Sequence, residues 1–312
     1  MVSEKKYLKA NSVENALKLA LEQKENFKFI AGGTDVLVNK FQGNETVDCL
    51  IDLSEIAEMR SISKEENQLK IGSLVTLHQL HQHPAICAEY KVLAEAAKSV
   101  ASPMIRKTAT LGGNLLCENR CSFYNQSDWW REAVGYCLKC DGEICIATGG
   151  KKNCFSKFVS DMAVALISLN ATIDVAGSNG IATVKLEDIY TGDGVNPRRF
   201  EKTSIIKAIN LPQNEGYKSV FKKLRQRESL EFSSLTTVVT VSKNGAVKIV
   251  LGGVDPKPVV VEGILNNNKE DFIKQALKKA RIVDNDVFTR KYRHEMIGVY
   301  LKKSFEEILT NN

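Results

Sequence analysis

Six of the eight cysteines in this chain lie between Cys117 and Cys154. They are Cys117, Cys121, Cys137, Cys140, Cys145 and Cys154. Clustered thiolates bind iron–sulfur clusters or zinc, and reduced cysteines also pack well in a core. The segment has one C-x₂-C pair, whereas familiar zinc knuckles use two and plant-type [2Fe–2S] sites use C-x₄-C-x₂-C. The cysteines alone therefore leave three interpretations open: a four-cysteine iron–sulfur site, a structural zinc site, or reduced cysteines in a core.

The first of two glycine turns lies in the segment just before residue 38. Its residues are Phe29, Ile30, Ala31, Gly32, Gly33, Thr34, Asp35, Val36 and Leu37. Glycine permits a positive φ and lets a phosphate approach the main chain, and free N–H groups at a helix start attract an anion. The spacing matches neither a Rossmann nor a Walker A motif. An ordinary strand-to-helix turn, with Thr34 and Asp35 as caps, is the alternative.

The second glycine turn, Thr110-Leu-Gly-Gly-Asn114, comes directly before the cysteine segment. By itself it is as consistent with a tight hairpin as with a loop that binds a ligand. Two Gly-Gly turns at the ends of apolar strands can, however, hold one diphosphate from two sides. The pair is therefore a more specific signal for a diphosphate ligand than either turn alone.

The apolar pattern around these turns predicts an α+β protein with two N-terminal α/β subdomains. In subdomain 1, residues 1–54, it predicts a helix at 12–24, a strand at 27–30, a helix at 36–41 and a strand at 49–52. In subdomain 2, residues 55–190, it predicts a strand at 69–72, helices at 76–81 and 93–100, and strands at 172–175 and 182–184. The cysteine segment, about 117–155, interrupts this second subdomain as an insertion.

A C-terminal domain is predicted at residues 191–312, as an antiparallel sheet flanked by helices. Its expected strands are 204–210, 235–241 and 247–251, and its expected helices are 266–280 and 286–301. The net charge of +6 is spread along the chain in lysine pairs, so we expect no nucleic-acid binding. No apolar run approaches the ~18 residues of a membrane span. The first six residues lack a signal core, which predicts a cytoplasmic protein with reduced thiols.

Three segments together resemble the FAD-binding subunits of the molybdenum hydroxylase (xanthine oxidase) family: 31–37, 102–106 and 110–114. The resemblance extends over nearly the whole chain, and it implies FAD as cofactor in a PCMH/VAO-like domain. Asp161 matches a position that contacts the ribityl and ring region of the flavin, and Lys223 matches a lysine near the flavin. Besides these two, the implied FAD-binding residues are 29–37, Ser102, Thr110, Gly112, Gly113 and Asn114.

The stretch from Arg120 to Lys139 resembles one branch of this family. In that branch, the β subunits of 4-hydroxybenzoyl-CoA reductases, an inserted loop carries a [4Fe–4S] cluster. By position the resemblance implies Cys121, Cys137, Cys145 and Cys154 as the metal ligands, with the other two cysteines of the segment spare. Phe123, Tyr124, Trp129 and Trp130 are candidates to shield such a cluster from water.

The resemblance also implies a function and partners. It implies an electron-transfer subunit of a molybdenum-dependent 4-hydroxybenzoyl-CoA reductase-like complex, which removes the phenolic hydroxyl of its substrate. The implied partners are a molybdopterin-containing large subunit, a small subunit with two [2Fe–2S] clusters, in a dimer of heterotrimers, and a ferredoxin-type donor. The alternatives are a flavin subunit serving another aromatic or N-heterocyclic substrate and, in a different class, a zinc-stabilised binding module. We find no catalytic acid–base or nucleophile motif in this chain.

Overall fold

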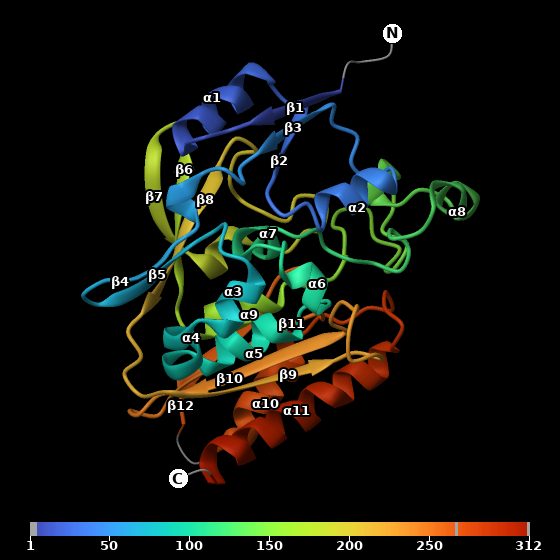
Figure 1. The fold of residues 1–312 in the computed structure, drawn as a ribbon. Helices are drawn as coiled ribbons and strands as arrows, with labels where there is room; N and C mark the ends of the chain where they lie inside the picture. The colour runs from blue at the N-terminus through green and yellow to red at the C-terminus, as the bar shows by residue number, and fades with distance from the viewer. Residues whose placement is uncertain (1–4, 266–267, 311–312) are drawn as a thin grey trace.

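The computed structural model describes residues 5–265 and 268–310, which form three sheets with helices packed between and around them (Figure 1). The N-terminal sheet is parallel, in the order β1-β3-β2. Its elements are β1 (Lys6–Lys9), α1 (Val13–Glu22), β2 (Phe27–Ile30), α2 (Val36–Phe41) and β3 (Cys49–Asp52). The predicted strands at 27–30 and 49–52 are confirmed, as is the helix capped by Ser12, whose hydroxyl accepts from the Asn15 N–H at 3.1 Å. The sequence did not predict β1.

The second sheet has five strands in the order β4-β5-β8-β6-β7, and all of its pairings are antiparallel. Its strands are β4 (Ile62–Lys64), β5 (Gln68–Gly72), β6 (Thr172–Gly177), β7 (Gly180–Lys185) and β8 (Ile205–Pro212). The strand β8 was expected in the C-terminal sheet, and this expectation was wrong, because β8 pairs with β5 and β6. Strand patterning reports which residues are buried, but it does not say which neighbour the strand joins.

Short helices connect the strands of this middle region, and two of them lie within the cysteine segment. They are η1 (Ala57–Met59), α3 (Leu77–Gln82), α4 (Pro84–Glu89), α5 (Lys91–Ser99), α6 (Pro103–Arg106), α7 (Leu111–Leu115), α8 (Asp128–Val134), η2 (Leu138–Cys140), α9 (Asp161–Ser168) and η3 (Leu186–Ile189). The predicted helices at 76–81 and 93–100 correspond to α3 and α5, and α4 was not predicted. In Figure 1, α8 projects from the side of the molecule that also carries α2.

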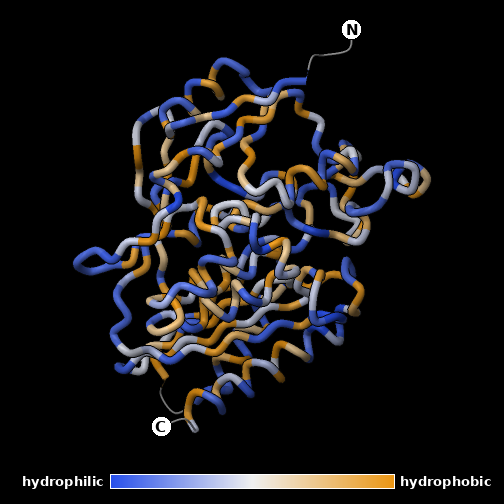
Figure 2. Tube along the Cα trace, in the orientation of Figure 1, coloured by the Kyte–Doolittle hydropathy of each residue, from blue (hydrophilic) through white to orange (hydrophobic). Residues whose placement is uncertain are grey.

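The third sheet is antiparallel, in the order β12-β11-β10-β9, and two helices cover one of its faces. Its elements are β9 (Lys218–Leu224), β10 (Leu235–Val241), β11 (Ala246–Gly252), β12 (Val259–Ile264), α10 (Lys269–Lys279) and α11 (Arg290–Thr310). The predicted helix at 266–280 begins on residues that lie outside the described ranges. Hydrophobic and hydrophilic residues alternate along α11 in Figure 2, as expected of an outer helix.

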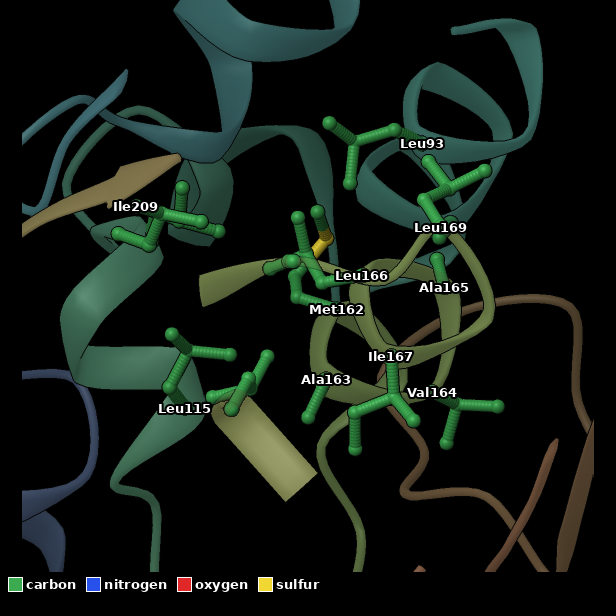
Figure 3. Packing of buried hydrophobic residues seen from close by; sticks show 14 of the residues in the cluster. Leu93, Leu115, Met162, Ala163, Val164, Ala165, Leu166, Ile167, Leu169 and Ile209 are labelled. Carbon is green, nitrogen blue, oxygen red and sulfur yellow. The ribbon is translucent and has the colours of Figure 1, made fainter. Parts of the chain in front are cut away.

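The core lies around α9, in which every residue from Asp161 to Ser168 is buried. Figure 3 shows α9 side chains such as Leu166 packed among Leu93, Leu115 and Ile209, which come from α5, α7 and β8. Successive residues of β10 point to opposite faces, so Val238 packs toward α9, whereas Val239 packs toward α10 and α11. Asp161 is therefore a carboxylate at the start of the most buried helix of the fold. In residues 5–265 and 268–310, no helix is both long and apolar enough to cross a membrane.

Candidate functional site

A cavity of about 890 Å³ lies where subdomain 1, the cysteine segment and the C-terminal sheet meet. This volume is within the range of sites for small molecules and cofactors. Fourteen of the sixteen FAD-site residues implied by the resemblance line it. These are Phe29, Ile30, Ala31, Gly32, Gly33, Thr34, Asp35, Val36, Thr110, Gly112, Gly113, Asn114, Asp161 and Lys223. The other two do not line it: the Leu37 side chain is half exposed, and the Ser102 hydroxyl caps α6.

The first glycine turn is shaped by both of its glycines. Gly33 has φ +71°, a conformation that other residues rarely adopt. A Cβ on Gly32 would lie 1.8 Å from the carbonyl oxygen of Thr108, so only glycine lets this turn contact the turn that follows α6. Asp35 occupies the N-cap position of α2, but its side chain does not cap that helix. Instead its carboxylate accepts the Glu118 N–H at 3.0 Å and pairs with Arg120.

The second glycine turn is the start of helix α7 and not a tight hairpin, which was one of the two interpretations that its sequence left open. The Thr110 hydroxyl caps α7 by accepting the Gly113 N–H at 3.1 Å. A Cβ on Gly112 would lie 2.7 Å from the Cβ of Ser73, so this glycine also allows close packing. Asn114 Oδ1 accepts from the Ser160 hydroxyl at 2.8 Å, which joins α7 to the residue that precedes Asp161.

Asp161 and Lys223 were identified separately in the sequence, and they contact each other in the cavity wall. The Lys223 ammonium lies 2.5 Å from the Asp161 carboxylate, and both side chains are about 95% buried, with 5% and 4% exposed. Asp161 also accepts from the hydroxyls of Ser233 and Thr236. The neighbouring Lys222 pairs with Glu307 and does not line the cavity. The structure thus distinguishes the two adjacent lysines by position.

Several charged residues near the cavity were not identified from the sequence. Glu118 lies within reach of Lys139, at 2.9 Å, and of Arg198, at 3.7 Å. Burial by itself would raise the pKa of Glu118, but Lys139, Arg198 and Lys28 outweigh burial and lower this pKa to about 2. The guanidinium of Arg198 also donates to the Cys117 carbonyl. A signal was present, because Glu118 follows the second glycine turn within a few residues, but charged residues beside cysteines are common.

The cysteine segment is a loop closed at its base. Arg120 and Lys157 form an isolated antiparallel bridge, with N–H to carbonyl distances of 3.0 and 2.8 Å. Between them, the side chains of Cys121, Cys137 and Tyr124 form a small apolar cluster. The expected shielding role fits Tyr124, which is 6% exposed, whereas Trp129 is 75% exposed and does not shield the segment.

The four predicted metal ligands are all buried. Burial raises the pKa of Cys121 to about 11, and a thiolate charge on Cys154 or Cys137 would raise this pKa further. Burial likewise raises the pKa of Cys154, and a thiolate charge on Cys145 would raise it by a smaller amount. All four thiols are buried and lie within the loop that the Arg120–Lys157 bridge closes.

The two remaining cysteines of the segment differ from each other. Cys117 lies before the bridge that closes the loop, and it lines the cavity, as Cys121 also does; its charged neighbours are Asp35, Arg198 and Arg120. Burial raises the pKa of Cys117 to about 12, so this thiol is neutral near pH 7. Cys140 is partly exposed and packs against the cluster of Cys121, Tyr124 and Cys137. Cys117 is therefore set apart from the predicted ligands, whereas Cys140 is adjacent to one of them.

Across the described ranges, no three His, Cys, Asp or Glu side chains converge as ligands of one metal ion. A [4Fe–4S] cluster makes a different demand, because its four thiolates surround a body of iron and sulfide rather than a single ion. The residues that could hold such a cluster are the four buried cysteines of the loop closed at its base, where Tyr124 packs against two of them. The cavity fits FAD, because glycine main chain and buried polar side chains both reach its wall.

Comparison with known proteins agrees with this geometry. Residues 3–214 match the family model of the FAD binding domain in molybdopterin dehydrogenase. The FAD-binding subunit of aldehyde oxidoreductase from Escherichia coli is 30% identical over 253 residues, 78% of this chain and 80% of that protein. The FAD-subunit of nicotinate dehydrogenase from Eubacterium barkeri is 29% identical over 206 residues, 65% of this chain and 57% of that protein.

Solved structures show the same fold at lower identity. A structure of the Cu,Mo-CO dehydrogenase in its cyanide-inactivated form superimposes with a TM-score of 0.80 at 20% identity, over 100% of both chains. A chain of quinoline 2-oxidoreductase from Pseudomonas putida superimposes with a TM-score of 0.77 at 17% identity, over 99% of this chain and 98% of that one. The α+β fold class predicted from the sequence is confirmed. This chain belongs to the family of FAD-binding domains of molybdopterin dehydrogenases, the flavin subunits of the molybdenum hydroxylases.

Proposed function

We propose that this chain is the electron-transfer subunit of a molybdenum-dependent complex and holds both FAD and a [4Fe–4S] cluster. The observation that carries the proposal is the closed cysteine loop, whose four buried thiols lie in a segment that also lines the cavity of this member of a FAD-binding family. When bound, the two cofactors supply carriers for a one-by-one relay of electrons. Everything else that the chain contributes is binding, orientation and exclusion of water.

The residues of the cavity have distinct tasks in this proposal. The two glycine turns bring main chain close to the diphosphate, since Gly32 and Gly112 let their segments pack without side chains between them. The Asp161–Lys223 pair presents a fixed polar wall, held in place by Ser233 and Thr236. Because this pair is buried, its orientation is set by the fold rather than by solvent.

The thiols of the closed loop have the task of binding the cluster. Cys121, Cys137, Cys145 and Cys154 are the proposed ligands, and Tyr124 packs beside them to limit access of water. Lys139 lies 4.7 Å from the Tyr124 ring centre and donates to the Asn119 carbonyl at 3.2 Å. A cation close to the thiolates favours the more reduced, more negative state of a cluster.

The partners and the reaction follow from the same proposal. We place substrate chemistry on a molybdopterin-containing large subunit, with a small [2Fe–2S] subunit between it and this chain, as a dimer of heterotrimers in the cytoplasm. The preferred reaction is the reductive dehydroxylation of 4-hydroxybenzoyl-CoA with electrons from a ferredoxin-type donor. This preference is supported by the similarity of residues 120–139 to the inserted loop of that branch.

A second candidate is a dehydrogenase acting on an aldehyde or an N-heterocycle, in which electrons leave through this chain. It is favoured by the names of the two relatives given above, an aldehyde oxidoreductase and a nicotinate dehydrogenase. Both candidates assign the same task to this chain. They differ in the direction of electron flow and in the substrate on the large subunit, so turnover by the complex purified from its native source separates them.

Serine replacements of the cysteines test the metal site directly. Cys137→Ser and Cys145→Ser are expected to abolish iron binding in anaerobically purified protein, while FAD supplied in excess still binds. Cys117→Ser is the matched control, because Cys117 is buried in the same segment but lies outside the loop closed by Arg120 and Lys157, and it is expected to keep about four irons per chain. One zinc per chain in place of iron, with no flavin, would instead support the zinc-stabilised binding module.

A further inference from the structure

The base of the cysteine loop carries two buried cations that reach in different directions. We call the bridged residues Arg120 and Lys157 the neck of the cysteine segment. Their side chains are 10% and 9% exposed, and both residues line the cavity. Each cation pairs with a carboxylate that belongs to another part of the fold. The neck is therefore the point at which the segment, the cavity and two distant elements come together.

Arg120 connects the neck to the first glycine turn. Its guanidinium pairs with Asp35, at the end of that turn, and Asp35 also accepts the Glu118 N–H at 3.0 Å. On its other side the guanidinium lies 4.3 Å from the centre of the Phe232 ring, which belongs to the segment between β9 and β10. Two residues next to the loop thus hold the turn proposed to contact the FAD diphosphate.

Lys157 connects the neck to the opposite wall of the cavity. Its ammonium pairs with Asp286 and donates to the Ser233 carbonyl at 3.1 Å. The hydroxyl of the same Ser233 donates to Asp161, which pairs with Lys223. One residue therefore separates the neck from the buried ion pair that faces the flavin in our proposal.

The ends of the loop are fixed to the C-terminal part as well. The Ser122 N–H donates to the Asn285 carbonyl at 3.1 Å, and the Asn285 amide donates to the Phe155 carbonyl at 2.7 Å. Ser122 follows Cys121 directly, and Phe155 follows Cys154. Asn285 therefore binds both ends of the loop. Its main-chain carbonyl binds the residue next to Cys121, and its side-chain amide binds the residue next to Cys154. A change in the packing of the thiols can therefore displace the neck through these few contacts.

From these contacts we propose that the neck couples the cysteine segment to the FAD cavity. Ordering of the segment around its cluster tightens the binding of FAD, and FAD in turn slows the loss of iron. This inference rests on the proposed function, since it needs a cluster in the loop. The physical basis is that a buried ion pair tolerates few arrangements, so a displaced neck shifts Asp35 and Ser233 together. By linkage, FAD must strengthen the equilibrium binding of the cluster by the same free energy by which the cluster strengthens the binding of FAD.

A double-mutant cycle on FAD affinity separates coupling from general structural damage. The segment is perturbed by Cys137→Ser with Cys145→Ser, and the neck by Arg120→Met with Lys157→Met. In the wild-type neck, the cysteine changes are expected to raise the Kd for FAD about tenfold. In the altered neck the same cysteine changes are expected to raise it by about twofold or less. A neck with only a structural role would instead give the same ratio in both backgrounds.

Lys70→Met is the matched control, because it breaks a lysine–carboxylate pair, with Asp174 at 2.9 Å, in the five-stranded sheet away from the cavity. The tenfold ratio should survive in this variant. Arg120→Lys keeps the positive charge and should retain part of the coupling. If Arg120→Met with Lys157→Met fails to fold, wild-type protein alone still gives a decision. Saturating FAD should slow the release of iron to a chelator, and an unchanged rate would overturn the proposal.

The outcomes also separate this inference from the proposed function. If the wild-type protein binds iron, but the cysteine changes raise the Kd for FAD by the same factor in the altered neck as in the wild-type neck, the coupling is refuted and the proposed function stands. Wild-type protein that binds FAD but no iron, after anaerobic purification, refutes the proposed function and this inference with it. Iron, FAD and protein are measured in each variant, so each result is assigned to one of these cases.

Discussion

Replacing Gly32 by alanine tests how the two glycine segments build the cavity. The new Cβ would lie 1.8 Å from the Thr108 carbonyl oxygen, and ordinary contact begins at 3.4 Å, so the two segments would have to separate by about 1.6 Å. The obstacle is main chain, which has no rotamer by which to move aside. Overpacking of this kind costs about 1–3 kcal/mol, and we expect the upper part of that range.

The expected consequence for FAD is larger than the loss of stability alone would suggest. Gly32 lies in the turn that contacts the proposed diphosphate position, so separation of the segments displaces main-chain N–H groups from the cavity wall. We expect the Kd for FAD to rise at least about tenfold, which corresponds to about 1.4 kcal/mol. Quenching of flavin fluorescence during a titration gives the Kd, and denaturant unfolding gives the stability.

Gly43→Ala is the matched control for this experiment. Gly43 has φ +73°, and a Cβ there meets no atom within 4 Å. Alanine at this position costs about 1–2 kcal/mol of backbone strain without a clash, and Gly43 itself does not line the cavity, whereas its neighbours Gln42 and Asn44 do. Its Kd for FAD should match that of the wild type. The reasoning is refuted if Gly32→Ala binds FAD as tightly as Gly43→Ala does.

Two other predictions follow from the charged groups of the cavity. Lys223→Met leaves Asp161 buried without its cation, so it should destabilise the protein by about 3–5 kcal/mol in denaturant unfolding. Lys222→Met is the control: it removes a partly exposed ion pair and should cost less than about 1 kcal/mol in the same assay. Glu118 has a pKa lowered from 4.5 to about 2 in the folded state, so its contribution to stability is complete above pH 4.5 and is lost as the pH falls toward 2. In Glu118→Gln, the free energy of unfolding should therefore fall less between pH 4.5 and 2 than it does in the wild type. An unchanged pH dependence would argue against the ion pairs of Glu118 with Lys139 and Arg198.

Local signals in the sequence predicted much of the fold. The helix capped by Ser12 and the strand at 27–30 were predicted because capping and apolar periodicity act within a few residues. The membership of β8 in the middle sheet was not predictable in this way, because partners such as Asn210 and Lys70 are far apart in sequence. β1 was missed because four residues at a sheet edge, three of them exposed, carry little apolar pattern.

The site was predictable to the extent that its residues carry recognisable types. Both glycine turns were found, but the steric reason for Gly32 depends on Thr108, which no local pattern connects to it. Arg120 and Lys157 were missed as a pair, since only the closed loop brings them together. Their carboxylate partners come from other elements of the chain, which is why the neck is visible only in three dimensions.

The central claim is that one chain binds a flavin and a four-iron cluster side by side. The most direct measurement is a count of FAD, iron and acid-labile sulfide per chain in anaerobically purified protein, with low-temperature EPR after reduction. We predict one FAD, about four irons with matching sulfide, and an EPR signal that is lost in Cys137→Ser but kept in Cys117→Ser. FAD without iron or sulfide in the wild-type protein, or a cluster that survives Cys137→Ser, would contradict the claim.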